Sequence, residues 1–309
     1  MMMRPWRRAA VVAAGLAFLG AGLACSESPP AGPSAPGGER PLRILSLTPN
    51  ITEILFAMGL GDRVVGRSTY CTYPPEALAV PAVGDTIHLS LEKIIRLEPT
   101  LAFLVARPEA VRHDATLARL ESLGIRVVPL QADRMDEMLN AIRTLGRETR
   151  EEEAAQALLD RIQGDLDRVR KQVAGLSRPR VLFVCPMSVG SSRVLVAGRG
   201  TFVDGLLDVA GAENVYPDEA NWPTLSPQQV IALAPDVVII NAVGSNAPPD
   251  RVETIRQSWA SLTGVPAVAN GRVHILTEPY LTIPGPRVGQ AAERLAEAIH
   301  PQRKEAPSP

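Results

Sequence analysis

Residues 89–104 read LSLEKIIRLEPTLAFL, and residues 225–240 read LSPQQVIALAPDVVII. The second stretch repeats the pattern of the first after 136 positions (225 − 89 = 136). In both copies apolar residues recur at helical spacing. Pro99 or Pro235 then ends the helix, because proline disfavours helical backbone in the residue before it. A short apolar run follows and predicts a buried strand, so the chain contains the same helix-then-strand unit twice.

The repeat extends on both sides of this unit. RILSL at 43–47 matches RVLFV at 180–184 as an opening strand, and GIRVVPL at 124–130 matches GRVHILT at 271–277 as a closing strand. Each half therefore alternates strands with helices, which predicts a parallel sheet covered by helices. We expect an α/β fold with two Rossmann-like lobes, at residues 42–147 and 177–300. A ligand cleft would lie between them, beyond the carboxyl ends of the strands.

One long amphipathic helix is predicted between the halves, at residues 148–176. Its apolar residues are spaced by three and four, so they form a single stripe. The stripe consists of Ala155, Leu158, Leu159, Ile162, Leu166, Val169 and Val173. At 1.5 Å per residue this connecting helix would be about 40 Å long. A helix of that length is a poor hinge, so we expect movement of the lobes to be small.

The N-terminus has the pattern of a bacterial lipoprotein signal. Three arginines precede an apolar run that ends in AGLAC, with Ala24 directly before Cys25. We expect residues 1–24 to be a signal peptide and Cys25 to be lipidated; an ordinary secretory signal is the alternative. Residues 25–41 are rich in Pro, Gly and Ser and predict a flexible tether, and residues 301–309 a disordered tail. The body would be a membrane-anchored, exported lipoprotein at the periplasmic face or the cell surface.

Charge and cysteine content narrow the function classes. Without residues 1–24 the chain has 29 basic and 33 acidic residues, a net charge of −4 (29 − 33). It has no basic stripe, which argues against nucleic-acid binding. Beyond Cys25 only Cys71 and Cys185 remain. They allow one disulfide across the cleft, but separate buried thiols are favoured because the repeat does not place them opposite each other.

Aromatic residues are rare, at 4% of the chain, so their positions are informative. Tyr70 and Tyr73 follow the second strand of the first half, Trp222 precedes the second copy of the unit, and Tyr280 follows the last strand. All four lie on predicted loops near the expected cleft, where they would form a wall for a large flat ligand. Each of them could instead only pack within its own loop.

Several long segments resemble the iron/vitamin B12 family of substrate-binding proteins, the receptors of ABC importers for corrinoids, haem and iron siderophores. They include RILSLTPNITEILFAMGLGDRVVGRSTYCTYPPEA, NWPTLSPQQVIALAPDVVII and GPRVGQAAERLAEAIHP. The resemblance covers about residues 42–300 and is strongest to members that bind vitamin B12. It implies two α/β lobes joined by a helix, and a monomeric receptor that is not an enzyme and has no catalytic cofactor. The ligand would be a corrinoid (cobalamin-like), haem or a ferric siderophore, delivered to an ABC permease and its ATPase.

The resemblance also implies residues for docking to the permease. In relatives that bind vitamin B12 an acidic residue on each lobe meets arginines of the permease. Glu92 matches the first of these positions, and Gln228, which is neutral, matches the second. Docking would then be asymmetric, unless Asp218 or Glu219 substitutes for the missing charge. Glu92 could alternatively serve only as a carboxylate at a helix N-terminus, where the helix dipole stabilises it.

Three further residues are candidate ligand contacts by the same resemblance. Thr86 stands where relatives that bind vitamin B12 have a tryptophan. This departure argues against cobalamin itself as the ligand. His88 could be an axial ligand to haem iron or corrinoid cobalt, although a loop histidine more often bonds only to water or backbone. No other direct metal ligand is expected. Arg287, at the start of the last helix, could meet a carboxylate or phosphate of the ligand or could make a structural contact.

The sequence motifs give little support for an enzyme. AGRGTFVDG at 197–205 lacks the spacing of a dinucleotide loop and the lysine of a P-loop, so it is better read as a turn with Thr201 capping a helix. A metallochelatase-like tetrapyrrole enzyme is the alternative, because two lobes around a large cleft also suit that chemistry. The export signal argues against it, since a chelatase needs cytoplasmic substrates.

Overall fold

The structure is a computed structural model that describes residues 41–85, 88–107, 109, 114–186, 193–216, 218, 222–242 and 249–302. All of these residues belong to one compact unit that begins at Arg40. The predicted signal peptide, Cys25 and most of the tether lie outside the described residues. The described part has no helix that is long and apolar enough to cross a membrane.

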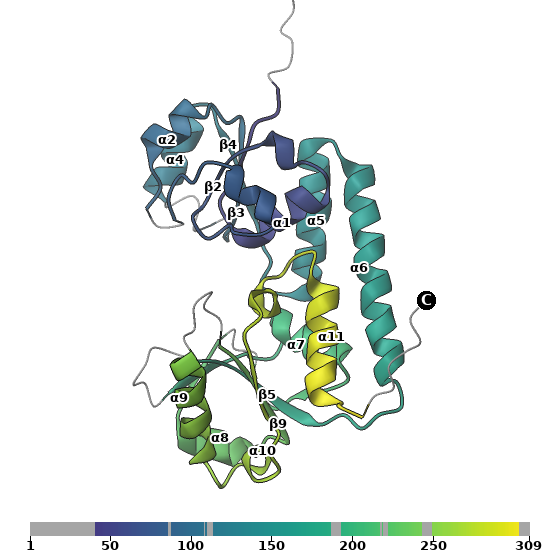
Figure 1. The fold of residues 1–309 in the computed structure, drawn as a ribbon. Helices are drawn as coiled ribbons and strands as arrows, with labels where there is room; N and C mark the ends of the chain where they lie inside the picture. The colour runs from purple at the N-terminus through teal and green to yellow at the C-terminus, as the bar shows by residue number, and fades with distance from the viewer. Residues whose placement is uncertain are drawn as a thin grey trace, which may run out of the picture. The chain divides into compact units, whose positions relative to one another are not determined.

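The first lobe is built on a four-stranded sheet in the order β2-β1-β3-β4, and every pairing in it is parallel, as predicted. Parallel neighbours require crossover connections, and here helices supply most of them. The elements in chain order are β1 (Ile44–Ser46), α1 (Pro49–Ala57), η1 (Gly61–Arg63), β2 (Val64–Arg67), η2 (Pro75–Ala79), α2 (Leu91–Arg96), β3 (Leu101–Val105), α4 (Ala115–Ser122) and β4 (Arg126–Leu130). Figure 1 shows them in purple and blue, with the helices around the sheet.

The second lobe has a six-stranded sheet in which β10-β9-β5-β6-β8 form the main path and β7 also pairs with β5. Its elements are β5 (Arg180–Pro186), β6 (Val194–Val196), α7 (Phe202–Val209), β7 (Glu213–Asn214), β8 (Thr224–Leu225), α8 (Pro227–Leu233), β9 (Val237–Asn241), α9 (Pro249–Ala260), α10 (Pro266–Ala269), β10 (Val273–Leu276), η3 (Pro279–Thr282) and α11 (Val288–Ile299).

The prediction of a parallel sheet is correct for β10, β9, β5 and β7. It is wrong for β6 and β8. β6 pairs antiparallel with β5 and with β8. The reason is the length of the connection, since only residues 187–193 separate β5 from β6. A parallel crossover needs roughly a dozen residues or more, so the chain can only turn back.

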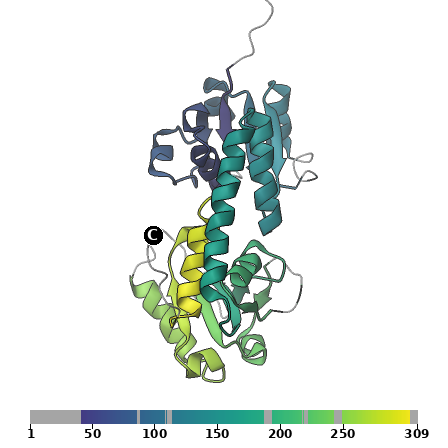
Figure 2. The same ribbon diagram turned by 90° about the vertical axis from the view of Figure 1, so that its right-hand side faces the viewer.

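Two helices, α5 (Met135–Thr149) and α6 (Glu152–Val173), follow the first lobe and pack against each other. The whole predicted stripe of α6 is buried. The helix is shorter than predicted, because Arg150 adopts a left-handed conformation with φ +59° and ends α5 before α6 begins. α6 is therefore about 33 Å long at 1.5 Å per residue. Figure 2 shows it beside α11, the last helix of the chain.

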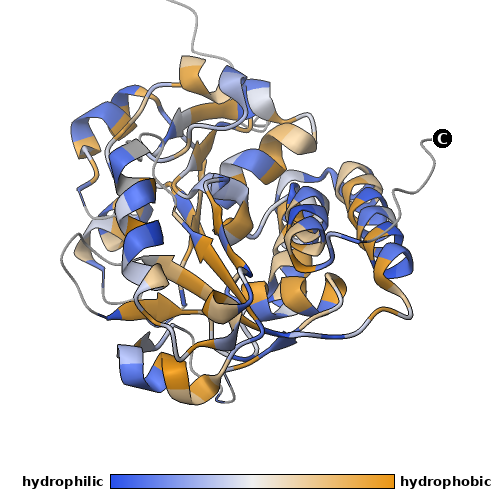
Figure 3. Ribbon diagram, turned by 60° about the horizontal axis from the view of Figure 1, so that its bottom comes forward, coloured by the Kyte–Doolittle hydropathy of each residue, from blue (hydrophilic) through white to orange (hydrophobic). Residues whose placement is uncertain are grey.

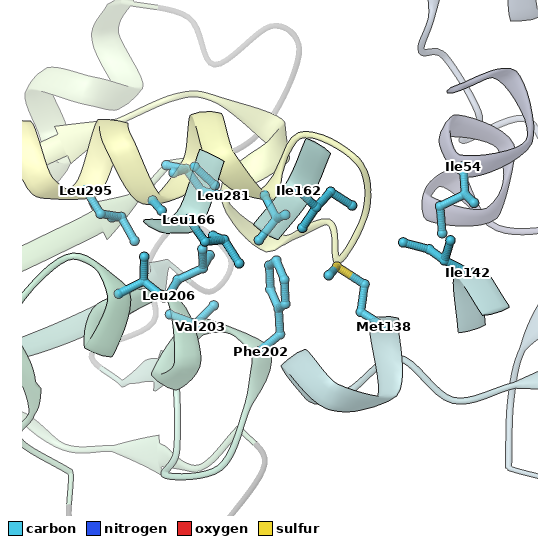
Figure 4. Packing of buried hydrophobic residues seen from close by; sticks show 14 of the residues in the cluster. Ile54, Met138, Ile142, Ile162, Leu166, Phe202, Val203, Leu206, Leu281 and Leu295 are labelled. Atoms are coloured by element: carbon cyan, nitrogen blue, oxygen red, sulfur yellow. The ribbon is translucent and has the colours of Figure 1, made fainter. Parts of the chain in front are cut away.

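A continuous apolar core runs through these helices. Met138 and Ile142 of α5 contribute to the same cluster as Ile54 of α1, and so do Ile162 of α6 and Phe202 of α7. Figure 4 shows Ile142 turned toward Ile54, and Met138 on the side of Phe202. In Figure 3 the strands are mainly hydrophobic, whereas many helices are coloured differently on their two sides. Burial of one face per helix is what the sequence pattern predicts.

The internal repeat is reproduced in local geometry. Ser90 and Ser226 cap α2 and α8, and each hydroxyl accepts a hydrogen bond from the backbone N–H three residues later, at 3.4 Å in both cases. At the other end Glu98 and Ala234, each directly before the proline, have φ of +44° and +45°. Non-glycine residues rarely adopt this conformation, so its occurrence at both equivalent positions confirms that the repeat is structural.

An arginine from the opening strand stabilises each of these helix ends. Arg43 donates from Nη2 and Nε to the carbonyl oxygen of Leu97, at 2.7 and 3.1 Å. Arg180 donates from Nη1 to the carbonyl oxygen of Ala234, at 3.2 Å. Carbonyl groups in the last turn of a helix have no partner within the helix, and a cation there also suits the helix dipole. Arg43, directly before β1, thus ties the end of α2 to the first sheet. Arg180 of β5 ties the end of α8 to the second sheet in the same way.

Candidate functional site

The tyrosine loop, residues 68–74, follows β2 at the carboxyl edge of the first sheet. Its base is held from inside, because Ser68 and Cys71 are fully buried. The Ser68 hydroxyl accepts a hydrogen bond from the backbone N–H of Tyr70 at 3.2 Å and lies 3.4 Å from Cys71 Sγ. The two aromatic side chains point outward, with exposed fractions of 62% for Tyr70 and 42% for Tyr73. This loop therefore presents aromatic surface where parallel sheets usually bind ligands.

Arg287 and Glu53 form a buried ion pair beside this loop. Arg287 is the N-cap residue of α11, and Glu53 lies in the middle of α1. Nε donates to Oε2 at 2.8 Å and Nη2 donates to Oε1 at 2.6 Å, the bidentate geometry of a guanidinium with a carboxylate. The side chains are only 12% and 2% exposed. Removing one partner of such a buried pair typically costs about 3–5 kcal/mol, since the other charge remains without compensation.

Two tyrosine rings cover the same guanidinium. Arg287 Cζ lies 3.9 Å from the centroid of the Tyr73 ring and 5.1 Å from that of Tyr280. Both distances are within the range of cation–π interaction. The structure thus brings together three of the predicted ligand-binding residues, Tyr73, Tyr280 and Arg287, around a fourth residue that was not predicted. Because Glu53 occupies Nε and Nη2, Arg287 here makes the structural contact that the sequence analysis left open.

Burial raises the pKa of Glu53 above its ordinary value, and the hydrogen bonds and charge of Arg287 oppose that rise. The bidentate geometry is that of an ionised carboxylate, so the pair is charged in the folded protein. Burial also raises the pKa of Tyr280, and the nearby carboxylate of Glu278 adds to this effect. The hydroxyl group of Tyr280 therefore remains protonated and neutral at physiological pH.

A cavity of about 510 Å³ adjoins the ion pair. Its walls come from α1, the tyrosine loop, η2, α6 and the start of α11. They consist of Glu53, Phe56, Ala57, Tyr73, Pro74, Glu76, Arg161, Asp165, Pro286, Arg287 and Gln290. Tyr73 thus contacts Arg287 and also lines the open cavity, which explains why its side chain is partly exposed.

The other predicted ligand contacts lie apart from this cluster or outside the description. Trp222 is half-buried and packs against the same core as Tyr280. Thr86 lies outside the described residues. His88 is 82% exposed on its loop, and its backbone N–H bonds to Asp85 Oδ1 at 2.6 Å while Nδ1 lies 3.4 Å from Asp85 Oδ2. Asp85 therefore orients His88.

The two predicted docking positions are both exposed, on equivalent helices. Glu92 lies in the first turn of α2, with its side chain 75% exposed, and forms a surface ion pair with Arg96 one turn later. Gln228 lies in the first turn of α8, beyond the Ser226 cap. An exposed i,i+4 pair contributes only about 0.3–0.5 kcal/mol, so Arg96 holds the Glu92 side chain weakly.

Cysteines and potential metal ligands add no further site among the described residues. Cys71 and Cys185 are free thiols, as favoured from the sequence. Burial raises the pKa of the Cys185 thiol to about 12, so this group is protonated and unreactive near neutral pH. The described part of the chain contains no group of three or more His, Cys, Asp or Glu side chains that could hold a metal ion.

A model of the periplasmic binding protein family matches residues 44–280 of this chain. The chain belongs to the periplasmic binding protein family. A relative from Bacillus subtilis, the uncharacterized ABC transporter substrate-binding lipoprotein YvrC, is 30% identical over 265 residues, which are 85% of this chain and 81% of that protein. The vitamin B12-binding protein of Pectobacterium carotovorum is 26% identical over 261 residues, 84% of this chain and 88% of that protein.

A solved structure in this family has the same fold. The apo form of the periplasmic haem-binding protein RhuT from Roseiflexus superposes with a TM-score of 0.69 at 30% identity, over 84% of this chain and 98% of that chain. The family resemblance and the fold expected from the sequence are therefore confirmed. The matched relatives are named as a substrate-binding lipoprotein of an ABC transporter, a vitamin B12-binding protein and a periplasmic haem-binding protein, roles in which the bound molecule is cargo.

One residue of the site escaped the sequence analysis. Glu53 stands in NITEILFAMG, on a helix whose residues from Asn50 to Leu55 are all buried. A carboxylate on such a face signals a buried partner, because an unpaired buried charge is too costly. The sequence could have raised this question for Glu53, but Arg287 is 234 residues away and only the fold identifies it as the partner.

Proposed function

We propose that this chain is an exported receptor that binds a corrinoid, haem or a ferric siderophore non-covalently and delivers it to an ABC permease. The observation that carries the proposal is the exposed Tyr70 at the carboxyl edge of the first sheet, in a chain of a family whose matched members bind vitamin B12 or haem. A ring offered to solvent at a binding edge suits a large flat ligand, since aromatic side chains bury much area with little loss of entropy.

The remaining predicted contacts extend this surface. Trp222, Tyr280 and His88 would add to the wall on which the ligand rests, and Thr86 stands two positions before His88 in the sequence. Binding without chemistry is supported by what the matched relatives do, because they are named as binding proteins or transport receptors. No feature of the described residues favours the chelatase alternative, and we propose no enzymatic role.

Delivery would use the two equivalent helices. Glu92 on α2 would exchange Arg96 for an arginine of the permease, and Gln228 on α8 would dock by hydrogen bonds and not by charge. The protein would act as a monomer on a membrane, held there by a lipid on Cys25 through the tether. This anchoring is supported by the AGLAC pattern and by the relative from Bacillus subtilis, which is named a lipoprotein.

The proposal is tested by a ligand panel on the protein that begins at residue 26. Hemin, cyanocobalamin, cobinamide and several ferric siderophores are titrated, and binding is followed by their absorbance and by quenching of tryptophan fluorescence. At least one ligand is expected to bind with a Kd at or below about 10 μM, near −7 kcal/mol. If none of them binds at that level, the ligand class is wrong.

Substitutions then locate the site. Tyr70→Ala and Trp222→Ala are each expected to weaken binding about tenfold, because a stacked aromatic ring contributes about 1–3 kcal/mol. Leu123→Ala, on an exposed apolar side chain after α4, is the matched control and should bind as the unaltered protein does. Unchanged affinity in an aromatic variant would remove that residue from the site.

A further inference from the structure

Arg287 links elements that are far apart in the sequence. Its guanidinium bonds to Glu53 of α1 through two nitrogens and stacks on Tyr73 of the tyrosine loop and Tyr280 of η3. Gly285 lies close to the same place, since a Cβ on it would be 3.7 Å from Glu53 Oε2. The last segment of the chain is thus fixed against α1 and the loop by one cation.

The tyrosine loop has two anchors, one in its middle and one near its end. In its middle Cys71 is fully buried, and its thiol lies 3.9 Å from the carbonyl oxygen of Ser46 in β1. At its end the ring of Tyr73 rests on Arg287 at 3.9 Å. Tyr70 directly precedes the first anchor and is the most exposed large hydrophobic side chain among the described residues, at 62%. Its position is therefore set by anchors that do not include Tyr70 itself.

The two hydrogen bonds to Glu53 fix the position of the Arg287 guanidinium. A guanidinium that loses a bidentate carboxylate keeps its charge and five donors, and it moves to the nearest water or acceptor. The adjoining cavity of about 510 Å³ offers such a place, because Glu76 and Asp165 are among its walls. Movement of Arg287 into that cavity would remove the stacking partner from Tyr73 and free the end of the loop.

From this geometry we propose that Glu53 and Arg287 are positioning residues for ligand binding. Glu53 holds Arg287 against Tyr73, and this contact fixes the end of the loop that, three residues earlier, presents Tyr70 to the ligand. Both residues act through Tyr73: Glu53 is buried, and two of the three guanidinium nitrogens of Arg287 are bonded to it. The proposal rests on the receptor function proposed above and adds the residues that preorganise its aromatic surface.

The test uses the ligand of the panel that the unaltered protein binds most tightly. Glu53→Gln keeps the size of the side chain and removes its charge, and Arg287→Lys keeps the charge and removes the fork and the stacking surface. Each variant is expected to bind about tenfold more weakly, mainly through faster release, as loss of preorganisation predicts. The near-ultraviolet circular dichroism of the tyrosines should also change, because Tyr73 loses its fixed neighbour.

A second, more exposed ion pair provides the control. Glu148 of α5 and Arg126 of β4 also form a fork, at 3.0 and 2.8 Å, but without aromatic neighbours in the site. Glu148→Gln should leave both affinity and tyrosine spectrum unchanged. Where Glu53→Gln does not fold, Tyr73→Leu replaces it, since that change removes the stacked ring while both charges of the pair remain.

A double-mutant cycle separates positioning from general stability. Tyr70→Ala is combined with Glu53→Gln, or with Tyr73→Leu, and binding is measured for all four proteins of the cycle. If Glu53 acts through Tyr70, the double variant loses little more affinity than Tyr70→Ala alone. Additive losses, or an affinity that stays constant while only the melting temperature falls, would overturn the proposal. Absence of binding by the unaltered protein would instead refute the receptor function.

Discussion

Gly146→Ala tests how closely α5 and α6 approach each other. A Cβ on Gly146 would lie 2.6 Å from Ala155 Cβ, and 3.3 Å from the backbone of Glu151 and Glu152. Carbon atoms in contact prefer about 3.5–4.0 Å, so the two helices would have to separate by about 1 Å. Because the obstacles are backbone and a Cβ, no side chain can rotate away to relieve the clash.

The magnitude follows from two opposing effects. Forcing an extra methyl group into a packed core costs about 1–3 kcal/mol. Alanine in place of glycine inside a helix returns about 1 kcal/mol through helix propensity. We therefore expect Gly146→Ala to lower the free energy of unfolding by up to about 2 kcal/mol. In a domain of this size each kcal/mol corresponds to roughly 2–4 °C in Tm.

Gly164→Ala is the matched control, on the neighbouring helix. Gly164 is exposed in α6, and a Cβ on it would meet nothing within 4 Å. This variant should raise the free energy of unfolding by about 0.5–1 kcal/mol. Urea unfolding at 25 °C measures both variants, and their difference isolates the clash because the propensity gain is common to both. Equal stabilisation by the two substitutions would refute the close helix approach.

Three further predictions concern docking and titrating groups. Glu92→Lys should reduce ligand uptake by cells about two- to fivefold, as expected for one exposed charge pair, and leave the Kd unchanged; normal uptake would contradict the docking role. Because burial raises the pKa of Cys185 to about 12 and Cys71 is fully buried, a thiol reagent at pH 8 should label the folded chain from residue 26 very slowly and find two thiols after unfolding. Burial, assisted by Arg272 and Arg294, lowers the pKa of His274. The folded state thus binds fewer protons, so stability should fall as the pH drops below about 6.5. His274→Gln should reduce this loss, and an unaltered pH profile would count against it.

Local patterns predicted the elements of the fold well. The stripe from Ala155 to Val173 is buried as a whole on one helix, and the repeated Leu-Ser and Leu-x-Pro frames begin and end α2 and α8. These features depend on neighbours within about four residues, which the sequence displays directly. The errors arose where that information is insufficient, at the left-handed Arg150 and at the antiparallel β6.

For the site, the sequence identified residue types but not their partners. It selected Tyr73, Tyr280 and Arg287 as aromatic and cationic candidates near one edge, and the structure places them together. Their arrangement depends on Glu53, which approaches Arg287 only after two lobes and two long helices have folded. No periodicity reports a contact over 234 positions.

The sequence by itself determined that this protein has two repeated α/β halves, because period and punctuation are local properties of a chain. Only the tertiary structure decided which carboxylate pairs with Arg287. A buried ion pair forms only where folding excludes water and brings both partners within hydrogen-bonding distance. The tertiary structure also decided how the two tyrosines of the loop differ, because Tyr73 stacks on Arg287 at 42% exposure while Tyr70 is 62% exposed.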